Sequence, residues 1–207
     1  MSMSIDHQDI VVSLAPYRDL PDALAQSIVD LAAKDLGSGY LDRRTLGTGN
    51  RIMAYAIQGS GSLAGFAIGR FVTTKEFVRE HPTVEKAIQR LGGIGGLAET
   101  VVVAPESRRR GFGARLMRAV YTQILVASSG APLLLPAWRH HDGAVPADGL
   151  ARRLGFVPYA IVPDYWFADS WARGYSCPSC GSPCRCAAHL YVLFPHEDTT
   201  GAHSLRL

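Results

Sequence analysis

The sequence predicts an α+β fold with a mixed, mostly antiparallel central sheet flanked by helices. Residues 51–58 and 62–72 are strand-like and are joined by a Gly-Ser turn, which indicates an antiparallel hairpin. Further along, Val101, Val102 and Val103 form an apolar run that is continuous enough for a strand buried on both faces. Strand and helix patterns then alternate up to residue 194, so crossover connections follow the hairpin.

The elements before the valine strand follow from apolar periodicity and from turn residues. Residues 9–14 read as a short first strand. A helix opens at Pro21, carries apolar residues at helical spacing and ends at Gly37. Segment 73–91 combines charges with a helical repeat, so we expect one or two short helices inserted after the hairpin.

The elements after the valine strand complete the sheet. Pro105 ends that strand, and an amphipathic helix follows from about Gly111 to Ala127. The remaining expected elements are a buried strand in 131–138, a short helix in 149–156, a strand from 157, a Trp-rich connector over 164–175 and a last strand at 188–194. We expect one domain over 1–207, with a Cys-rich knuckle at 175–188 and a mobile tail at 196–207.

The composition excludes several classes of protein. Of the 207 residues, 47% are hydrophobic and 19% are charged, which indicates a globular chain and not a disordered one. The net charge of +3 is too mild to indicate the basic face of a nucleic-acid binder. The N-terminus lacks signal-peptide features, and the apolar runs fall far short of the ~20 residues that span a bilayer. We therefore expect a cytoplasmic protein without nucleic-acid or membrane partners.

The stretch SRRRGFGARL at 107–116 joins the valine strand to the amphipathic helix. The first N–H groups of a helix have no partner within it, and the helix dipole favours an anion there. Glycine at 111 and 113 removes Cβ atoms that would keep a diphosphate away from those amides, and the three arginines add Coulomb attraction. A solvated basic face is the plain alternative, and a nucleic-acid patch is disfavoured because no aromatic platform is interleaved.

Arg108-x-x-Gly111-x-Gly113-Ala114, preceded by Val103-Ala104-Pro105-Glu106, resembles the acetyl-CoA signature of the GNAT superfamily of N-acetyltransferases. The order of elements from about residue 9 to 194 also fits that family. The resemblance implies a sheet splayed open between two strands, with the backbone of 98–103 pairing with the pantetheine arm and the amides that follow binding the pyrophosphate. The residues implied in acetyl-CoA binding are Val101, Val102, Val103, Arg108, Arg109, Arg110, Gly111, Phe112, Gly113 and Ala114.

Acetyl transfer from a thioester to an amine sets three chemical tasks. A lysine-like amine has a pKa near ~10.4, so a base or a water relay must remove its proton. Glu99 is the candidate base, because it lies just before the valines, where related enzymes often carry a carboxylate. A backbone N–H of Val101 or Val102 could stabilise the oxyanion. The departing thiolate of CoA needs a proton or another form of stabilisation.

The usual general acid of the family is missing. Related enzymes often place a tyrosine four residues before the glycine of a Gly-Phe pair, and here that position is Ala151. Tyr159, Tyr165 and His140 are the substitutes that the sequence offers, and histidine titrates in the right range. Direct attack without a dedicated acid is the alternative, since proximity alone accelerates such reactions.

All four cysteines of the chain lie in one run with the pattern C-x2-C-x3-C-x-C, namely Cys177, Cys180, Cys184 and Cys186. In a cytosolic chain this clustering favours a metal over disulfides. Four thiolates suit a closed, structural, tetrahedral zinc site. An iron–sulfur cluster, two disulfides, or zinc with His189 replacing one cysteine are the alternatives. Such a site would hold the 164–175 connector over the acceptor side of the sheet.

The sequence thus predicts an acetyl-CoA-dependent N-acetyltransferase that acts by direct attack of a primary amine of a small molecule, a peptide or a protein. A catalytically weak acyl-CoA-binding module, whose zinc-stapled end recruits a partner, is the alternative. Nucleic-acid binding by a zinc knuckle is disfavoured by the modest charge. The acceptor and the oligomeric state stay open, and a homodimer is one of the options.

Overall fold

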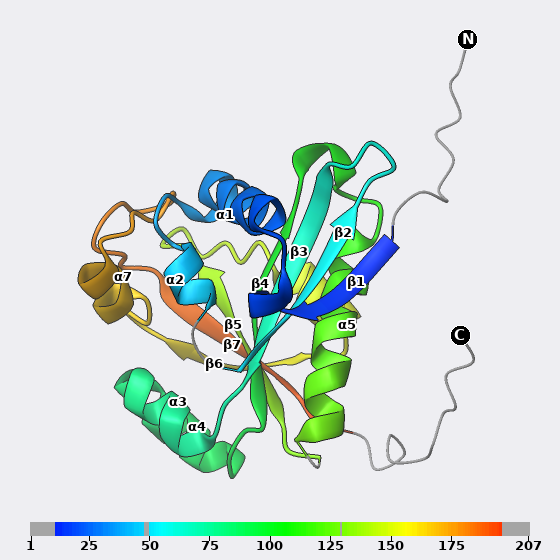
Figure 1. Cartoon of the computed structure of the whole chain (residues 1–207). Helices are drawn as coiled ribbons and strands as arrows, with labels where there is room; N and C mark the ends of the chain where they lie inside the picture. The colour runs from blue at the N-terminus through cyan, green and yellow to red at the C-terminus, as the bar shows by residue number, and fades with distance from the viewer. Residues whose placement is uncertain (1–10, 48–49, 129, 196–207) are drawn as a thin grey trace.

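The computed structural model describes residues 11–47, 50–128 and 130–195 (Figure 1). The strands are β1 (Val11–Pro16), β2 (Arg51–Ile57), β3 (Leu63–Phe71), β4 (Gly96–Val103), β5 (Leu133–Arg139), β6 (Val157–Val162) and β7 (Ala187–Leu193). The α-helices are α1 (Asp22–Leu36), α2 (Arg43–Leu46), α3 (Thr74–Glu80), α4 (Glu85–Leu91), α5 (Phe112–Ala127), α6 (Asp148–Arg153) and α7 (Phe167–Arg173). The start of the strand expected at 9–14 and the tail expected at 196–207 lie outside the described residues.

The described strands form one sheet in the order β1-β2-β3-β4-β5-β7-β6. Every neighbouring pair is antiparallel except β4 and β5, which run parallel. That parallel pair is also the shortest, because it contains only Gly96 opposite Leu133 and Leu97 opposite Leu134. The predicted fold class is therefore confirmed, including the opening of the sheet between two strands.

Helices cover both faces of the sheet. The long helix α5 packs against β2, β3 and β4 on one face, and its Leu116, Val120 and Ile124 are fully buried there. Helix α1 packs against β3 and β4 on the other face. A third buried cluster lies around β7 and includes residues of α3, α4 and the cysteine run. Figure 1 shows α3 and α4 projecting at the lower left of the molecule and α7 at its left edge.

Two short helices differ from the sequence expectation. The segment expected as a Trp-rich connector over 164–175 contains α7, which ends at Gly174 with a left-handed φ of +70°. Helix α2 is capped at its N-terminus by Asp42, whose side chain accepts a hydrogen bond from the amide of Thr45. A helix of one or two turns carries too few residues for a periodic pattern, so only tertiary packing shows that it forms.

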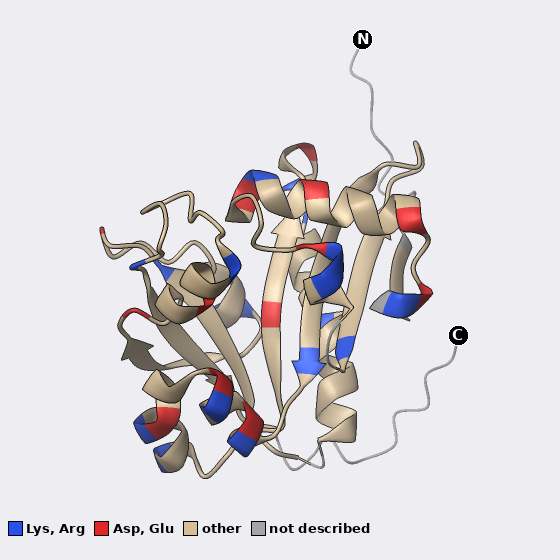
Figure 2. Ribbon diagram, turned by 60° about the vertical axis from the view of Figure 1, so that its left-hand side comes forward, with Lys and Arg blue, Asp and Glu red and all other residues tan. Residues whose placement is uncertain are grey.

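Charged residues are spread over the helices with both signs mixed, and the strands carry few of them in the view of Figure 2. Over the described residues, no helix combines the length and apolar character that crossing a membrane requires.

Strand β3 contains a glycine, Gly69, at a position where the neighbouring elements leave no room for a side chain. A Cβ at Gly69 would lie 2.4 Å from Val120 Cγ1, 2.7 Å from Ile124 Cδ1 and 2.8 Å from the Leu97 carbonyl oxygen. Gly69→Ala should therefore push α5 away from the sheet and lower the free energy of unfolding by about 1–3 kcal/mol.

Urea denaturation followed by circular dichroism measures this change. Gly149→Ala on α6 is the matched control, because an added Cβ there meets no atom within 4 Å. Equal stability of the two variants would contradict the close approach of α5 to β3.

Candidate functional site

The opening between β4 and β5 is the first component of the site. Beyond Leu97 and Leu134 the two strands no longer pair, so the β4 edge that faces β5 has no strand partner from Ala98 onward among the described residues. The side chains of Val101 and Val103 pack among the buried residues of α5, and the side chain of Val102 packs among those of α1 on the other face. The valines therefore anchor β4 through both faces and leave its edge N–H and C=O groups available to an extended ligand.

The second component is the start of α5, where β4 ends. Gly111 is the N-cap, with a left-handed φ of +81°, and no side chain caps the helix. The first amides of α5 thus have no acceptor within the helix. A Cβ at Gly113 would lie 3.6 Å from Val103 and 3.8 Å from Val101, at ordinary contact distance, so the protein alone does not require glycine at that position. An open, dipole-positive helix start next to an unpaired strand edge is suited to an elongated ligand that carries a phosphate.

The three predicted arginines have different surroundings. The Nε of Arg108 donates to the Val103 carbonyl at 2.9 Å, and its Nη2 donates to the two Asp35 oxygens at 2.8 and 2.6 Å. The side chain of Arg108 therefore braces the end of β4 against α1. Arg110 lies over the ring of Phe112, 5.3 Å from its centre. Arg109 is exposed and has a left-handed φ of +60°.

The third component is a cleft of about 920 Å³ on the face of the sheet opposite α5. Its walls come from the α1–α2 loop and α2 on one side and from the end of α3 and from α7 on the other. Its floor is the sheet, including Leu97 and Thr100 of β4 and Pro136 of β5. Because both β4 and β5 contribute to the floor, the cleft reaches the opening between them.

A β-bulge determines which β4 side chains face the cleft. Ile68 of β3 pairs with Thr100 and Gly69 pairs with Ala98, so Glu99 is the extra residue. Strict alternation would turn either Glu99 or Thr100 to the α5 face, yet both line the cleft. The bulge thus brings the predicted base, Glu99, into the cleft beside Thr100.

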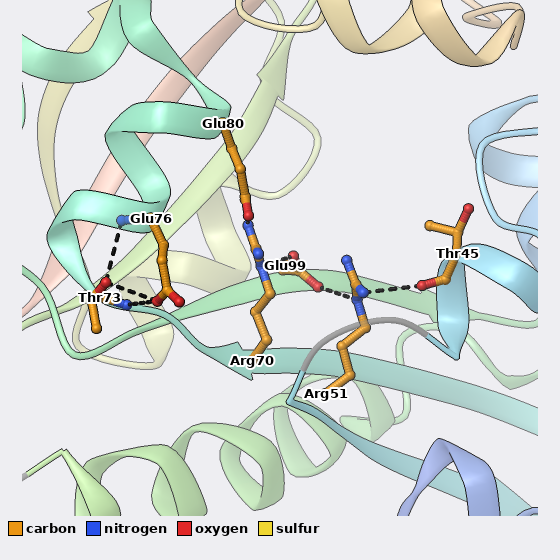
Figure 3. Close-up of polar contacts among 7 residues, drawn as sticks. All are labelled: Thr45, Arg51, Arg70, Thr73, Glu76, Glu80 and Glu99. Atoms are coloured by element: carbon orange, nitrogen blue, oxygen red, sulfur yellow. Dashed lines mark hydrogen bonds and ion pairs between the residues drawn. The ribbon is translucent and has the colours of Figure 1, made fainter.

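Both carboxylate oxygens of Glu99 are held by guanidinium groups (Figure 3). Its Oε1 lies 2.6 Å from Arg70 Nε, and its Oε2 lies 3.1 Å from Arg51 Nε. Arg51 also donates to the Thr45 carbonyl at 3.0 Å, and Arg70 also pairs with Glu80. The Glu99, Arg51 and Arg70 side chains are only 18, 15 and 12% exposed, so this network is shielded from water.

Strand register explains why the network exists. Arg51 of β2 and Arg70 of β3 lie directly opposite each other in the hairpin. Two like charges in that position destabilise a strand pair unless an anion lies between them. Sequence reasoning missed both arginines. A signal was present, because two arginines that face each other at the open end of a predicted hairpin require a carboxylate nearby.

The aromatic rings of Tyr40, Tyr165 and Trp166 line the cleft. The hydroxyl of Tyr40 lies 3.3 Å from Thr100 Oγ1, and its ring centre lies 5.2 Å from that of Trp138. Burial raises the pKa of Tyr40 to about 12 and raises that of Tyr165 as well. Both phenols therefore keep their protons at neutral pH.

The predicted acids are distributed over different places. Tyr165 lines the cleft. Tyr159 donates from its hydroxyl to the Ala87 carbonyl at 3.0 Å, and its side chain contributes nothing to the described lining of the cleft. His140 lies in the turn after β5, and Ala151 is fully buried on α6. Of the predicted base and the predicted acids, only Glu99 and Tyr165 belong to the described lining of the cleft.

The four cysteines converge on one point. Their Sγ atoms all lie within 4.8 Å of one another, with close pairs at 3.5, 3.7 and 3.8 Å. A tetrahedron with Zn–S bonds of ≈ 2.3 Å has edges of about 3.8 Å. The amides of Ser179 and Arg185 donate to Cys177 and Cys180 at 3.4 and 3.2 Å, an arrangement that stabilises thiolates. The donor set and its spacing therefore fit one tetrahedral metal ion.

The cysteine cluster lies directly behind the cleft wall. The amide of Cys184 donates to Ser170 Oγ at 2.7 Å, and Ser170 is fully buried on α7. The loop before α2 also packs on the cluster, since a Cβ at Gly37 would lie 1.9 Å from the Ser176 carbonyl oxygen. The cysteine run therefore contacts two walls of the cleft, the one formed by α7 and the one formed by the α1–α2 loop.

Solved structures that are similar to this chain share its fold. Naa20 of Chaetomium thermophilum, in complex with a bisubstrate analogue, matches at a TM-score of 0.60 and 16% identity over 93% of this chain and 90% of the other. Arabidopsis thaliana NAA60 with acetyl-CoA matches at 0.57 and 16% identity over 89% and 98% of the two chains. Ard1 of Thermoplasma volcanium matches at 0.56 and 17% identity over 91% and 99%. No curated protein sequence matches the chain.

The sequence model of one family matches residues 33–156, which include the hairpin, β4, the glycine-rich start of α5 and α6. This match spans more than half of the chain and contains the opening between β4 and β5 on which the site is built. The chain belongs to the acetyltransferase (GNAT) family.

Proposed function

We propose that this protein transfers the acetyl group of acetyl-CoA to a primary amine. The observation that carries the proposal is the opening between β4 and β5, which has the helix start of α5 at one end and the cleft on the opposite face. A thioester that enters along β4 and an amine that enters from the cleft would meet at this opening. Such a meeting supplies the proximity on which acyl transfer depends.

The donor would occupy the β4 edge and the start of α5. The free backbone groups of Val101 to Val103 would pair with the amides of the pantetheine arm, and the amides from Arg109 through Ala114 would bind the pyrophosphate. A β4 N–H at Val101 or Val102 would donate to the developing oxyanion. The NAA60 structure that holds acetyl-CoA supports this choice of donor.

The acceptor would occupy the cleft. Four arginines and four acidic residues line it, so its formal charge is balanced. The arginines are Arg44, Arg51, Arg70 and Arg173, and the acids are Asp42, Glu80, Glu99 and Asp169. The lining accommodates a small amine, a peptide or a protein side chain, and proton removal by Glu99 stays a prediction.

We propose that the four cysteines hold a structural zinc ion. Four thiolates would leave no coordination position for water or substrate, so the ion would contribute folding free energy and no catalytic step. Its place behind α7 and the α1–α2 loop would fix two walls of the cleft. Reduced thiols of this kind suit a cytoplasmic setting, which we propose for this protein.

Gly111→Glu tests the donor site. A side chain and a negative charge at the start of α5 would repel the pyrophosphate, so acetyl-CoA affinity should fall at least ~100-fold in calorimetric titration. Gly111→Ala is the matched control, because it imposes the same left-handed φ on a small neutral residue.

The wild-type protein, mixed with acetyl-CoA and an amine library, should release the free thiol of CoA. Mass spectrometry should detect the acetylated amines. Undiminished binding by Gly111→Glu would overturn the placement of the donor. Tight binding of acetyl-CoA without transfer to any amine would instead favour an acyl-CoA-binding module.

The metal proposal predicts one zinc ion per chain by elemental analysis. Cys184→Ser should lose the ion and lower the free energy of unfolding by at least about 2 kcal/mol, which lowers Tm by about 4–8 °C. Ser179→Ala is the control, since Ser179 contacts Cys177 through its backbone amide. Metal loss with no change in stability would contradict a structural role.

A further inference from the structure

The acidic residues of the cleft are already engaged. Glu99 is held by Arg51 and Arg70, and Glu80 pairs with Arg70. Asp169 lies 3.6 Å from Arg173 Nε. Asp42 caps α2 through the amide of Thr45. Each of these four carboxylates therefore already has an ion-pair or hydrogen-bond partner within the cleft.

His81 is the histidine that the described lining of the cleft contains. It follows α3 directly and belongs to the segment between β3 and β4, which the sequence predicts as a helical insertion. Its ring stacks on Tyr165, with centres 4.5 Å apart and planes 6° apart, and it also contacts the ring of Phe77 at 5.2 Å. This packing fixes the plane of the imidazole while leaving its edge at the cleft.

The charges around His81 come from four elements. Arg70 of β3 opposes a positive imidazole, whereas Glu80 of α3, Glu99 of β4 and Asp169 of α7 favour it. Burial outweighs these acids, and together with Arg70 it lowers the pKa of His81 below its usual value near 6.5. Tyr165, the remaining titratable group packed on the ring, keeps its proton because burial raises its pKa. His81 is therefore neutral at pH 7 and has a basic nitrogen available.

We propose that His81 is the group that accepts the proton of the acceptor amine, an inference that rests on the proposed acetyl transfer. The imidazole takes one proton from the ammonium ion, and the freed nitrogen lone pair attacks the thioester carbonyl. A C–N bond forms, the C–S bond breaks, and the second proton of the nitrogen passes through solvent to the departing CoA thiolate. The imidazolium then returns its proton to solvent, so the net products are the amide, CoA thiol and one proton.

Glu99 has a different task in this scheme. Its carboxylate holds Arg51 and Arg70 in place and so keeps the second guanidinium beside Glu80 and His81. Glu99 is thus a positioning residue for His81 and for the cleft floor.

The test compares His81→Phe with the wild-type protein over pH 6–10, with kcat/KM measured on an amine that the wild type acetylates. Phenylalanine keeps the ring stacked on Tyr165 and removes the basic nitrogen. At neutral pH, kcat/KM should fall at least ~100-fold. In the variant it should rise tenfold per pH unit as the free amine forms, and it should approach the wild-type value near the pKa of the amine.

Two further variants complete the design. His141→Phe, in the exposed turn after β5, should leave the profile unchanged. Glu99→Gln should lower kcat/KM without adopting the free-amine profile of His81→Phe. Acetyl-CoA affinity, measured on every variant, should equal that of the wild type.

The outcomes separate the two levels of the proposal. A wild-type protein that binds no acetyl-CoA or acetylates no amine would overturn the proposed function itself. A wild type that acetylates an amine, together with a His81→Phe profile parallel to it at all pH values, would overturn only the role of His81. A free-amine profile in Glu99→Gln and not in His81→Phe would assign the proton transfer to Glu99.

Discussion

The early end of pairing between β4 and β5 is the constraint on which the rest of the site depends. Two parallel strands that separate after Leu97 and Leu134 leave unsatisfied backbone groups in the middle of a sheet. Unpaired buried backbone groups are costly, so such an opening persists only when something else holds the strands apart and a ligand or solvent satisfies them. Here β4 is held by antiparallel β3 and by α5, while β5 is held by antiparallel β7.

The bulge at Glu99 is a second feature of β4 that shapes the site. It allows β4 to place two consecutive polar side chains on the cleft face while Val101 and Val103 remain packed on the α5 face. The extra residue also meets the two arginines that the β2–β3 register sets opposite each other. One irregularity in the strand therefore neutralises a like-charge pair and shapes the floor of the cleft.

The walls of the cleft come from segments with little regular structure of their own. The α1–α2 loop, the end of α3 and α7 are short, and each depends on contacts with its neighbours. The cysteine run contributes two of these contacts, from Cys184 to Ser170 of α7 and from Ser176 to Gly37 in the α1–α2 loop. The opening between β4 and β5, by contrast, is bordered by the long helix α5 and by the central strands.

The sequence by itself determined the features that are local along the chain. The valine strand, the glycine-rich start of α5 and the clustered cysteines are each set by backbone and side-chain chemistry within about ten residues. Only the tertiary structure decided what the cleft contains. Arg51 and Glu99 are 48 residues apart in the chain, and His81 reaches Tyr165 across several elements. Such contacts depend on strand register, on a bulge and on the packing of short helices, none of which leaves a periodic signal. For that reason the valine strand, the start of α5 and the cysteine run could be predicted, while the contents of the cleft could not.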